Sequence, residues 1–416
     1  MSSSSHSPTR HALRTWLPGF CLLALGLEAA PAQEIAFVPQ GEVSAEWASN
    51  RTLTVPSAPN SEDYSATLGG DLLRRTQVSD IDLRPLVTVQ HSSEISNLDR
   101  LEALVDLVSD YRTLRSEFTL NAEYHREDAY NAQYGLVAFN PLNPNAPDTQ
   151  GTGAIITGIT KTSYLVAPEF NYDITPRVGF VASASLDAAR YTTDIPNELV
   201  SYNSPEAYLG LTWALSPNSR VGAGPYYAYY DPIHSADGTV KNNAYGVSFD
   251  YQTKFSAVSQ SKLTVKVERD SQPAAFGLPS SQQTVWGFEW VGSHKFLTSS
   301  VQYSVGRFLQ PTSAGGRTSV EEVRVQYLKA FTARWSFNGA VRLTRDTAIA
   351  TLADDESGDR DRANVQLALS YLFTPTWSVS GGYRYAYLKF TDPTVSAHSN
   401  AIFLTVDYHG LQPPRN

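Results

Sequence analysis

Two consecutive runs of alternating apolar and polar residues at positions 362–387 constrain the fold of this chain more than any other stretch. The first run places apolar residues at every second position, and its apolar set is Ala363, Val365, Leu367, Leu369, Tyr371 and Phe373. After the turn Thr374-Pro375-Thr376 the alternation resumes from Trp377 to Tyr387. A period of two is the spacing of a β-strand, and Pro suits the second position of a tight turn. The stretch therefore predicts a β-hairpin with one apolar and one polar face.

The length of this hairpin matches a membrane. Trp377 and Tyr387 are ten residues apart, which is roughly 25 Å along a barrel axis at about 3.3 Å per residue and a tilt of about 40°. Aromatic ends, a small or aliphatic middle and a polar opposite face are typical of a strand with lipid outside and water inside. Because the same design recurs along the chain, the sequence predicts an all-β, transmembrane, antiparallel up-and-down barrel. The count is about 18 strands, with about sixteen as the alternative.

Composition and the N-terminus support one membrane domain after a leader. Charged residues are only 18% of the chain, below the roughly 25% of ordinary globular proteins. Residues 1–32 have the features of a signal peptide, with Arg10 and Arg14 before an apolar stretch and Ala30-Pro31-Ala32 at its end. We therefore expect a signal peptide at 1–32 and an outer-membrane barrel at 33–416.

Cleavage after residue 32 would remove the only cysteine, Cys21. No mature thiol would then be left for disulfide, zinc or nucleophile chemistry. A lipoprotein signal at Cys21 is the competing interpretation. Without the leader's Arg10, Arg14 and Glu28 the chain keeps 32 − 2 = 30 basic and 41 − 1 = 40 acidic side chains. This balance argues against nucleic acid as a partner.

The connections between the predicted strands give the barrel an orientation. Short turns alternate with longer polar connections, and in outer-membrane barrels the short turns face the periplasm. Four tryptophans are each predicted to lie within three residues of a short turn, which would make them a periplasmic aromatic girdle: Trp213, Trp290, Trp335 and Trp377.

These features together resemble bacterial outer-membrane porins, and in particular β-barrel porins that are often found with exopolysaccharide loci. The resemblance covers the whole mature chain and rests on the leader, the hairpin meander and the turn-proximal tryptophans rather than on a diagnostic motif. It implies a bacterial outer-membrane location, contact with lipid and a third external loop that folds into the pore. The C-terminus departs from the pattern, because the aromatic Tyr408 is followed by a tail instead of ending the chain.

Strand parity places two sets of charged residues on inward faces. The predicted acidic patch is Asp106, Glu117 and Glu123, and the predicted basic patch is Arg342, Arg362 and Arg384. In a ring of about eighteen strands the two patches would face each other across the lumen and set up a transverse field. Local salt bridging along the wall is the alternative.

Three other stretches of the sequence could suggest a site, but each also has a simpler structural interpretation. The long Asn/Pro/Gly-rich connection at 127–158 predicts either a pore constriction or a surface loop. The acidic stretch at 354–361 lacks the spacing of an EF-hand and predicts a solvated loop, with weak divalent binding as the alternative. His125 and Glu123 share a strand face that Ser116 does not, which argues against a catalytic triad.

The function expected from these patterns is passive diffusion of small polar solutes or saccharides through an outer-membrane channel, with no catalysis, no cofactor and no metal. A barrel component of an exopolysaccharide export or assembly system is the first alternative, and an outer-membrane hydrolase is the second. The expected partners are outer-membrane lipid and the solute, with a homo-oligomer left open.

Overall fold

The computed structural model describes residues 34–53, 57, 59–94, 100–129, 158–193, 199–233, 241–272, 281–311, 317–348, 360–390 and 395–411. The predicted signal peptide with Cys21, the Asn/Pro/Gly-rich segment at 130–157 and most of the acidic stretch, at 354–359, lie outside these residues.

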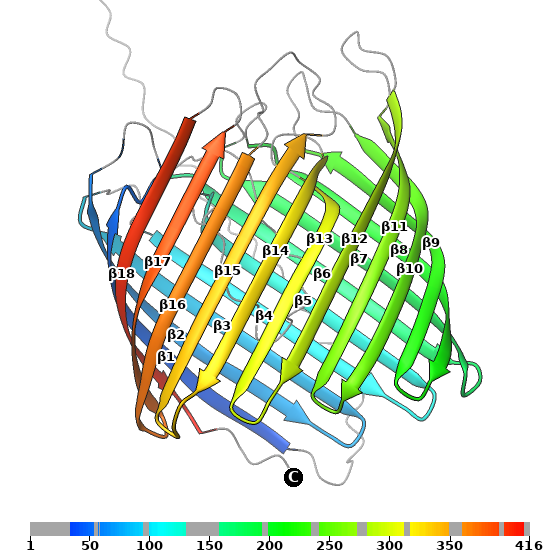
Figure 1. Cartoon of the computed structure of the whole chain (residues 1–416), viewed down its shortest axis with the longest axis horizontal. Helices are drawn as coiled ribbons and strands as arrows, with labels where there is room; N and C mark the ends of the chain where they lie inside the picture. The colour runs from blue at the N-terminus through cyan, green and yellow to red at the C-terminus, as the bar shows by residue number, and fades with distance from the viewer. Residues whose placement is uncertain are drawn as a thin grey trace, which may run out of the picture.

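Eighteen antiparallel strands form a single sheet that closes into a barrel (Figure 1). Each strand pairs with its neighbours in sequence, and β1 also pairs with β18, which closes the ring. The strands are β1 Glu34–Ser49, β2 Ser61–Arg75, β3 Ser79–Ser92, β4 Arg100–Arg112, β5 Ser116–Asp128, β6 Thr160–Asp173, β7 Val178–Tyr191, β8 Tyr202–Ser216, β9 Ser219–Pro232, β10 Asn242–Ser256, β11 Ser259–Gln272, β12 Ser281–Lys295, β13 Ser299–Pro311, β14 Arg317–Ala330, β15 Trp335–Ala348, β16 Arg360–Thr374, β17 Trp377–Phe390 and β18 Val395–His409. The predicted barrel of about 18 strands is confirmed. Within the described residues no helix is long and apolar enough to span a membrane.

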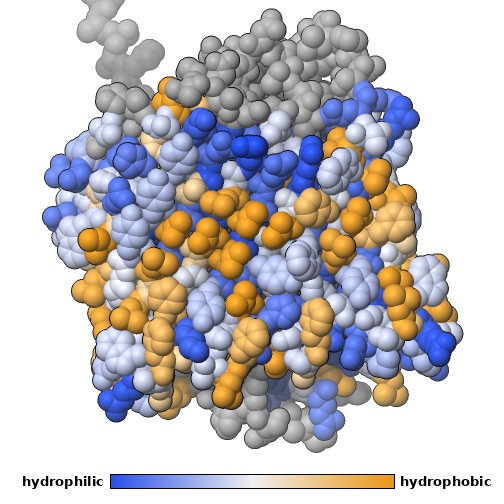
Figure 2. All heavy atoms as spheres, in the orientation of Figure 1, coloured by the Kyte–Doolittle hydropathy of each residue, from blue (hydrophilic) through white to orange (hydrophobic). Residues whose placement is uncertain are grey.

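The two faces of the sheet differ as the alternation predicts. On β18, Ile402 is 63% exposed while the next residue, Phe403, is 8% exposed. From Ile402 to Val406 the outward residues on this strand are apolar, whereas the outward residues Ser396, His398 and Asn400 are polar. The inward set consists mainly of small, polar or aromatic residues. Apolar side chains lie across the middle of the visible outer face, and hydrophilic ones gather near its upper rim (Figure 2). An apolar outer face on a closed ring is what a lipid-embedded barrel requires, because closure pairs the first strand with the last.

Strands β1 and β3 differ in detail from what the sequence predicts. The alternation predicts the first strand at 41–49, but β1 starts seven positions earlier, at Glu34, because its pairing with β2 continues down to Arg75. Ile35 and Phe37 extend the outward apolar face over this added length and are exposed. Strand β3 passes through Pro85, where the sequence predicts an edge or a bulge. Its ladder with β2 is interrupted there, between the pairs Gly69↔Leu86 and Leu72↔Leu83.

The short turns all lie at one end of the barrel, where both β1 begins and β18 ends (Figure 1). Five of them share one hydrogen bond, in which a threonine hydroxyl accepts from the backbone N–H three residues later at 2.9–3.0 Å. Such Ser/Thr turns close a hairpin locally and tightly. The threonines are Thr76, Thr113, Thr175, Thr332 and Thr374. The longer connections lie at the other end. That the short turns face the periplasm stays a prediction.

Candidate functional site: the charged wall of the lumen

Inward-facing charged residues line the barrel. Many of them pair with a charge of opposite sign on the same strand or one nearby. Because these groups sit between the wall and the lumen, their pairing decides which charges a solute would meet.

The three predicted acidic residues lie at two different levels. Asp106 on β4 and Glu123 on β5 are directly opposite each other in the ladder, and Asp106 is buried. Arg84 on β3 is opposite Asp106 on its other side and donates to Asp71 at 2.7 Å. Glu117 lies near the short-turn end of β5 and pairs with Arg112 at 2.7 Å. Of the three predicted acidic residues, the structure therefore brings only Asp106 and Glu123 together.

The three predicted basic residues each have a carboxylate partner. Arg342 contacts Glu322 with two nitrogens, at 2.8 Å from Nε and 2.5 Å from Nη2. Arg362 pairs with Asp346 of the adjacent strand β15. Arg384 pairs with Glu46 at 2.5 Å. The structure thus agrees with the local-pairing alternative for these arginines. The transverse field stays a prediction. The contribution of these arginines to such a field is small, because a carboxylate close to each one largely offsets its charge.

The carboxylate partners were not singled out in the sequence. Glu322 lies beside Arg324, and Arg324 is directly opposite Arg342 in the ladder, so one carboxylate serves two facing arginines. The register would have revealed this, because Glu322 shares its inward face with Arg324. Strand alternation alone gives the face but not the cross-strand neighbour.

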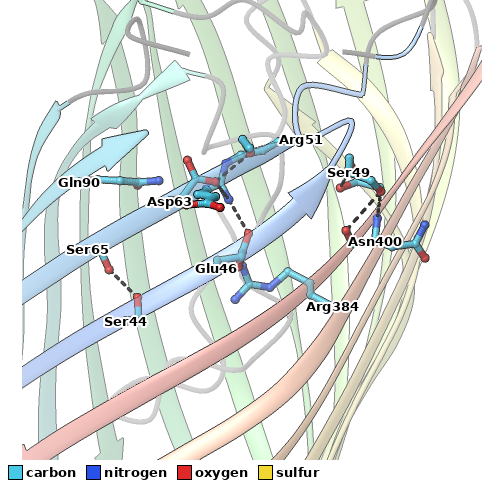
Figure 3. A network of polar contacts seen from close by, with 12 residues as sticks. Ser44, Glu46, Ser49, Arg51, Asp63, Ser65, Gln90, Arg384 and Asn400 are labelled. Atoms are coloured by element: carbon cyan, nitrogen blue, oxygen red, sulfur yellow. Dashed lines mark hydrogen bonds and ion pairs between the residues drawn. The ribbon is translucent and has the colours of Figure 1, made fainter. Parts of the chain in front are cut away.

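The pairs around Glu46 cross the seam where the barrel closes. Arg384 on β17 reaches over β18, above the ring of Phe403 at 5.4 Å, to Glu46 on β1. Glu46 also pairs with Arg51, which contacts Asp63 of β2 at 2.8 Å. Figure 3 shows Arg51 and Arg384 reaching Glu46 from different sides. The two ends of the sheet are therefore held by an ion-pair chain that spans four strands.

Two exposed inward cations lie on β11. The side chains of Lys262 and Lys266 are 54% and 39% exposed, and each approaches its carboxylate only to 3.8–3.9 Å. Lys266 also lies 4.3 Å from the centre of the Tyr226 ring. Strand parity also places both lysines on the inward face, although they are not part of the predicted basic patch. They are more accessible to a solute than Arg342 or Arg362.

A buried tyrosine cluster lies at the end of the barrel with the longer connections. Tyr191, Tyr202 and Tyr230 pack with Ala189, Ala129 and Leu199, and the rings of Tyr202 and Tyr230 are 5.4 Å apart. The described ends of the long connection meet beside this cluster, where Ala129 N donates to Ile159 O at 2.7 Å. The cluster therefore fixes where this connection leaves and rejoins the wall.

The barrel wall bends toward the lumen at Arg317, the first residue of β14. On β14 the odd-numbered residues Val323 and Tyr327 face outward and are exposed. Arg317 has the same parity, yet its side chain is 3% exposed and contacts Asp270 and Glu268, on the inward face of β11, at 3.5 and 3.6 Å. The start of β14 therefore lies on the lumen side of β11.

The four tryptophans of the predicted girdle all face outward and are exposed. Trp335 and Trp377 are the first residues of β15 and β17, and Trp213 lies three residues before the end of β8. Trp290 lies five residues before the end of β12 at Lys295, so the predicted spacing of three is wrong for this residue. It is held there by a 2.6 Å hydrogen bond from Nε1 to Ser261 Oγ. Their role as a membrane girdle stays a prediction.

The hydrolase candidates are not assembled. His125 Nδ1 lies 3.4 Å from Glu127, while Ser116 bonds to Thr113 in a short turn at the other end of β5. Among the described residues no group of three or more potential ligands could hold a metal ion.

Comparison with known proteins gives distant structural similarity. No protein-family model matches the sequence, and no curated protein matches it. The chain is similar to the crystal structure of Acinetobacter baumannii OccAB3, at 11% identity and a TM-score of 0.40, covering 90% of this chain and 98% of that one. Pseudomonas aeruginosa OpdQ gives 11% identity and 0.41, covering 91% and 99%. Pseudomonas aeruginosa OccK2 (OpdF) in complex with glucuronate gives 7% identity and 0.43, covering 90% and 98%.

Similarity at this level assigns no function, so the location is argued from the barrel itself. Its ring is closed, its outer face is apolar and its inner face is polar. These properties fit the bacterial outer membrane.

Proposed function

We propose that this protein is an outer-membrane channel for passive diffusion of small polar solutes, including small saccharides. The observation that carries the proposal is the contrast between the apolar outer face and the charged inner face of a closed 18-stranded ring. Barrels of about 16 to 18 strands are wide enough to leave an aqueous lumen. The paired charges give the wall polar groups without a large net field. Within the described residues no feature gives specific support to the export or hydrolase alternatives.

The full-length mature protein, reconstituted in planar bilayers, is expected to give stepwise ionic currents. Liposomes containing it should swell in solutions of small neutral sugars, at rates that fall as the sugar becomes larger. Empty liposomes and protein denatured by boiling are the controls. A correctly folded barrel that conducts no ions and admits no sugar would refute the proposal.

The β11 lysines should influence which ions pass. Replacing Lys262 and Lys266 together with Gln is expected to shift the reversal potential in a salt gradient toward cation preference, because these are accessible inward cations. The shift should be largest at low salt, since the Debye length is about 8 Å at physiological ionic strength and longer in dilute salt. Lys389→Gln is the control, because Lys389 has outward parity on β17. An equal shift of the reversal potential in the control and the double variant would show that the two lysines do not act on ions in the pore.

A further inference from the structure

The ladder between β12 and β13 ends early. It runs from Lys295↔Ser300 to Phe288↔Arg307, whereas β12 begins at Ser281 and β13 continues to Pro311. Residues 281–287 therefore have β11 as their only pairing partner among the described strands. In Figure 1 the upper part of β12 leans away from β13. We call this place the β12–β13 split.

The split faces outward because its lumen side is occupied. The start of β14, which pairs with the end of β13, lies on the lumen side of β11 through the contacts of Arg317 with Glu268 and Asp270. All three side chains are buried. The β13–β14 end thus turns inward behind β11, and the unpaired edge of β12 is left on the outer surface.

This edge lies at the level of outward aromatic residues. Trp286, two residues before the last pair of the ladder, is 54% exposed and stacks on Phe288 with ring centres 6.2 Å apart. Outward tyrosines such as Tyr227 and Tyr245 occur at a comparable distance from the short-turn ends of β9 and β10. Aromatic side chains collect where hydrocarbon meets lipid headgroups. A backbone edge at this level costs several kcal/mol unless polar groups satisfy its N–H and C=O groups.

Two outward arginines flank the split. Arg307 of β13 lies over the Trp286 ring at 5.3 Å, and its side chain is 36% exposed. Its Nε donates to Ser319 Oγ at 3.3 Å, and Nη1 approaches Glu321 only to 4.0 Å. Arg269 of β11 bonds to Gln282 of β12. A guanidinium with free donors, beside backbone N–H groups that face no described strand, is a binding arrangement for phosphate.

We propose that a phosphate-bearing lipid of the outer leaflet binds at the β12–β13 split. Arg307 donates to the phosphate, the free edge of β12 supplies backbone donors, and the acyl chains lie along Trp286 and Phe288. Glu321 faces Arg307 in the ladder and weakens the site, because its carboxylate competes with the phosphate for the guanidinium. This assignment is independent of whether the lumen conducts.

The test measures lipid A binding to the detergent-purified barrel by native mass spectrometry. Dephosphorylated lipid A and inorganic phosphate are the comparison ligands. Arg307→Gln should weaken lipid A binding about tenfold, which is the effect of losing a charge-assisted hydrogen bond. Glu321→Gln should strengthen it. The matched control is Arg345→Gln, an outward arginine on β15 that pairs with Asp361 at 2.8 Å in a fully paired part of the wall.

Each variant is compared only after its migration on gels before and after boiling matches that of the wild type. The proposal is overturned if Arg307→Gln and Arg345→Gln bind lipid A equally well. It is also overturned if dephosphorylated lipid A binds as tightly as lipid A, or if inorganic phosphate displaces the lipid at equal concentration. Glu321→Gln keeps the test decisive should Arg307→Gln fail to fold, since unchanged or weaker binding in that variant contradicts the site.

Discussion

Replacing Arg342 with Met is expected to lower the free energy of unfolding of the barrel by about 3 kcal/mol. Removing one partner of a buried ion pair typically costs about 3 to 5 kcal/mol, because the other charge is left uncompensated. Arg342 and Glu322 are both buried, and Arg324 at 3.8 Å still offsets part of the Glu322 charge, which places the effect at the lower end. Unfolding in urea, followed by the loss of heat-modifiable migration, measures it.

Arg345→Met provides the matched control on the same strand. Arg345 faces outward and pairs with Asp361, and both side chains are partly exposed. Exposed pairs contribute about 0 to 1 kcal/mol, so this variant should unfold nearly as the wild type does. The double replacement Arg342→Met with Glu322→Leu should recover only part of the lost stability, because Glu322 also pairs with buried Arg324 and its removal takes that carboxylate away. Equal destabilisation by Arg342→Met and Arg345→Met would contradict the assignment of a buried pair.

Replacing Arg317 with Gln is expected to free the inward-turned end of the β13–β14 hairpin and to raise single-channel conductance. The guanidinium compensates Glu268 and Asp270, which are both buried, so its loss leaves two carboxylates without their cation. The cost should again be about 3 to 5 kcal/mol, and separation of the two elements relieves it. Planar-bilayer recording of the reconstituted barrel measures the conductance.

The double variant Glu268→Gln with Asp270→Asn separates this explanation from a simple change of lumen charge. Both variants break the same contacts, so both should raise conductance if the contacts hold the hairpin inward. Their charge changes are opposite, so they should shift the reversal potential in opposite directions. Opposite shifts without any rise in conductance would show that the contacts do not position the hairpin.

Alternation was sufficient to predict the barrel from the sequence, because lipid imposes a strict demand on every second residue. The hairpin predicted around Thr374-Pro375-Thr376 is formed by β16 and β17, with Trp377 opening β17. The start of β1 was predicted too late, although Ile35 and Phe37 already continue the alternation. Pairing with the end of β2, a contact some forty residues away in the chain, extends that strand to Glu34.

The chemistry of the wall could be predicted only in part. Parity placed Arg342, Arg362 and Arg384 on inward faces, but the partner of each depends on register and on side-chain reach. Arg384 is the clearest case, since its partner Glu46 is 338 positions away and lies beyond β18. Trp290 is a second case in which a partner on another strand could not be predicted. It lies farther from the short turn than predicted, and its indole donates a hydrogen bond to Ser261 of β11.

The ion pair between Arg384 and Glu46 also has a consequence for the order in which the protein is made and assembled. Glu46 emerges near the start of synthesis and Arg384 near its end, and the two meet only when the first strand lies beside the last. Bringing together such distant segments carries a loop-closure entropy that grows with their separation. A contact absent before closure cannot speed the formation of the open sheet, and its stabilisation falls on the finished ring. The ion pair should therefore slow the separation of β1 from β18 without speeding the closure of the ring.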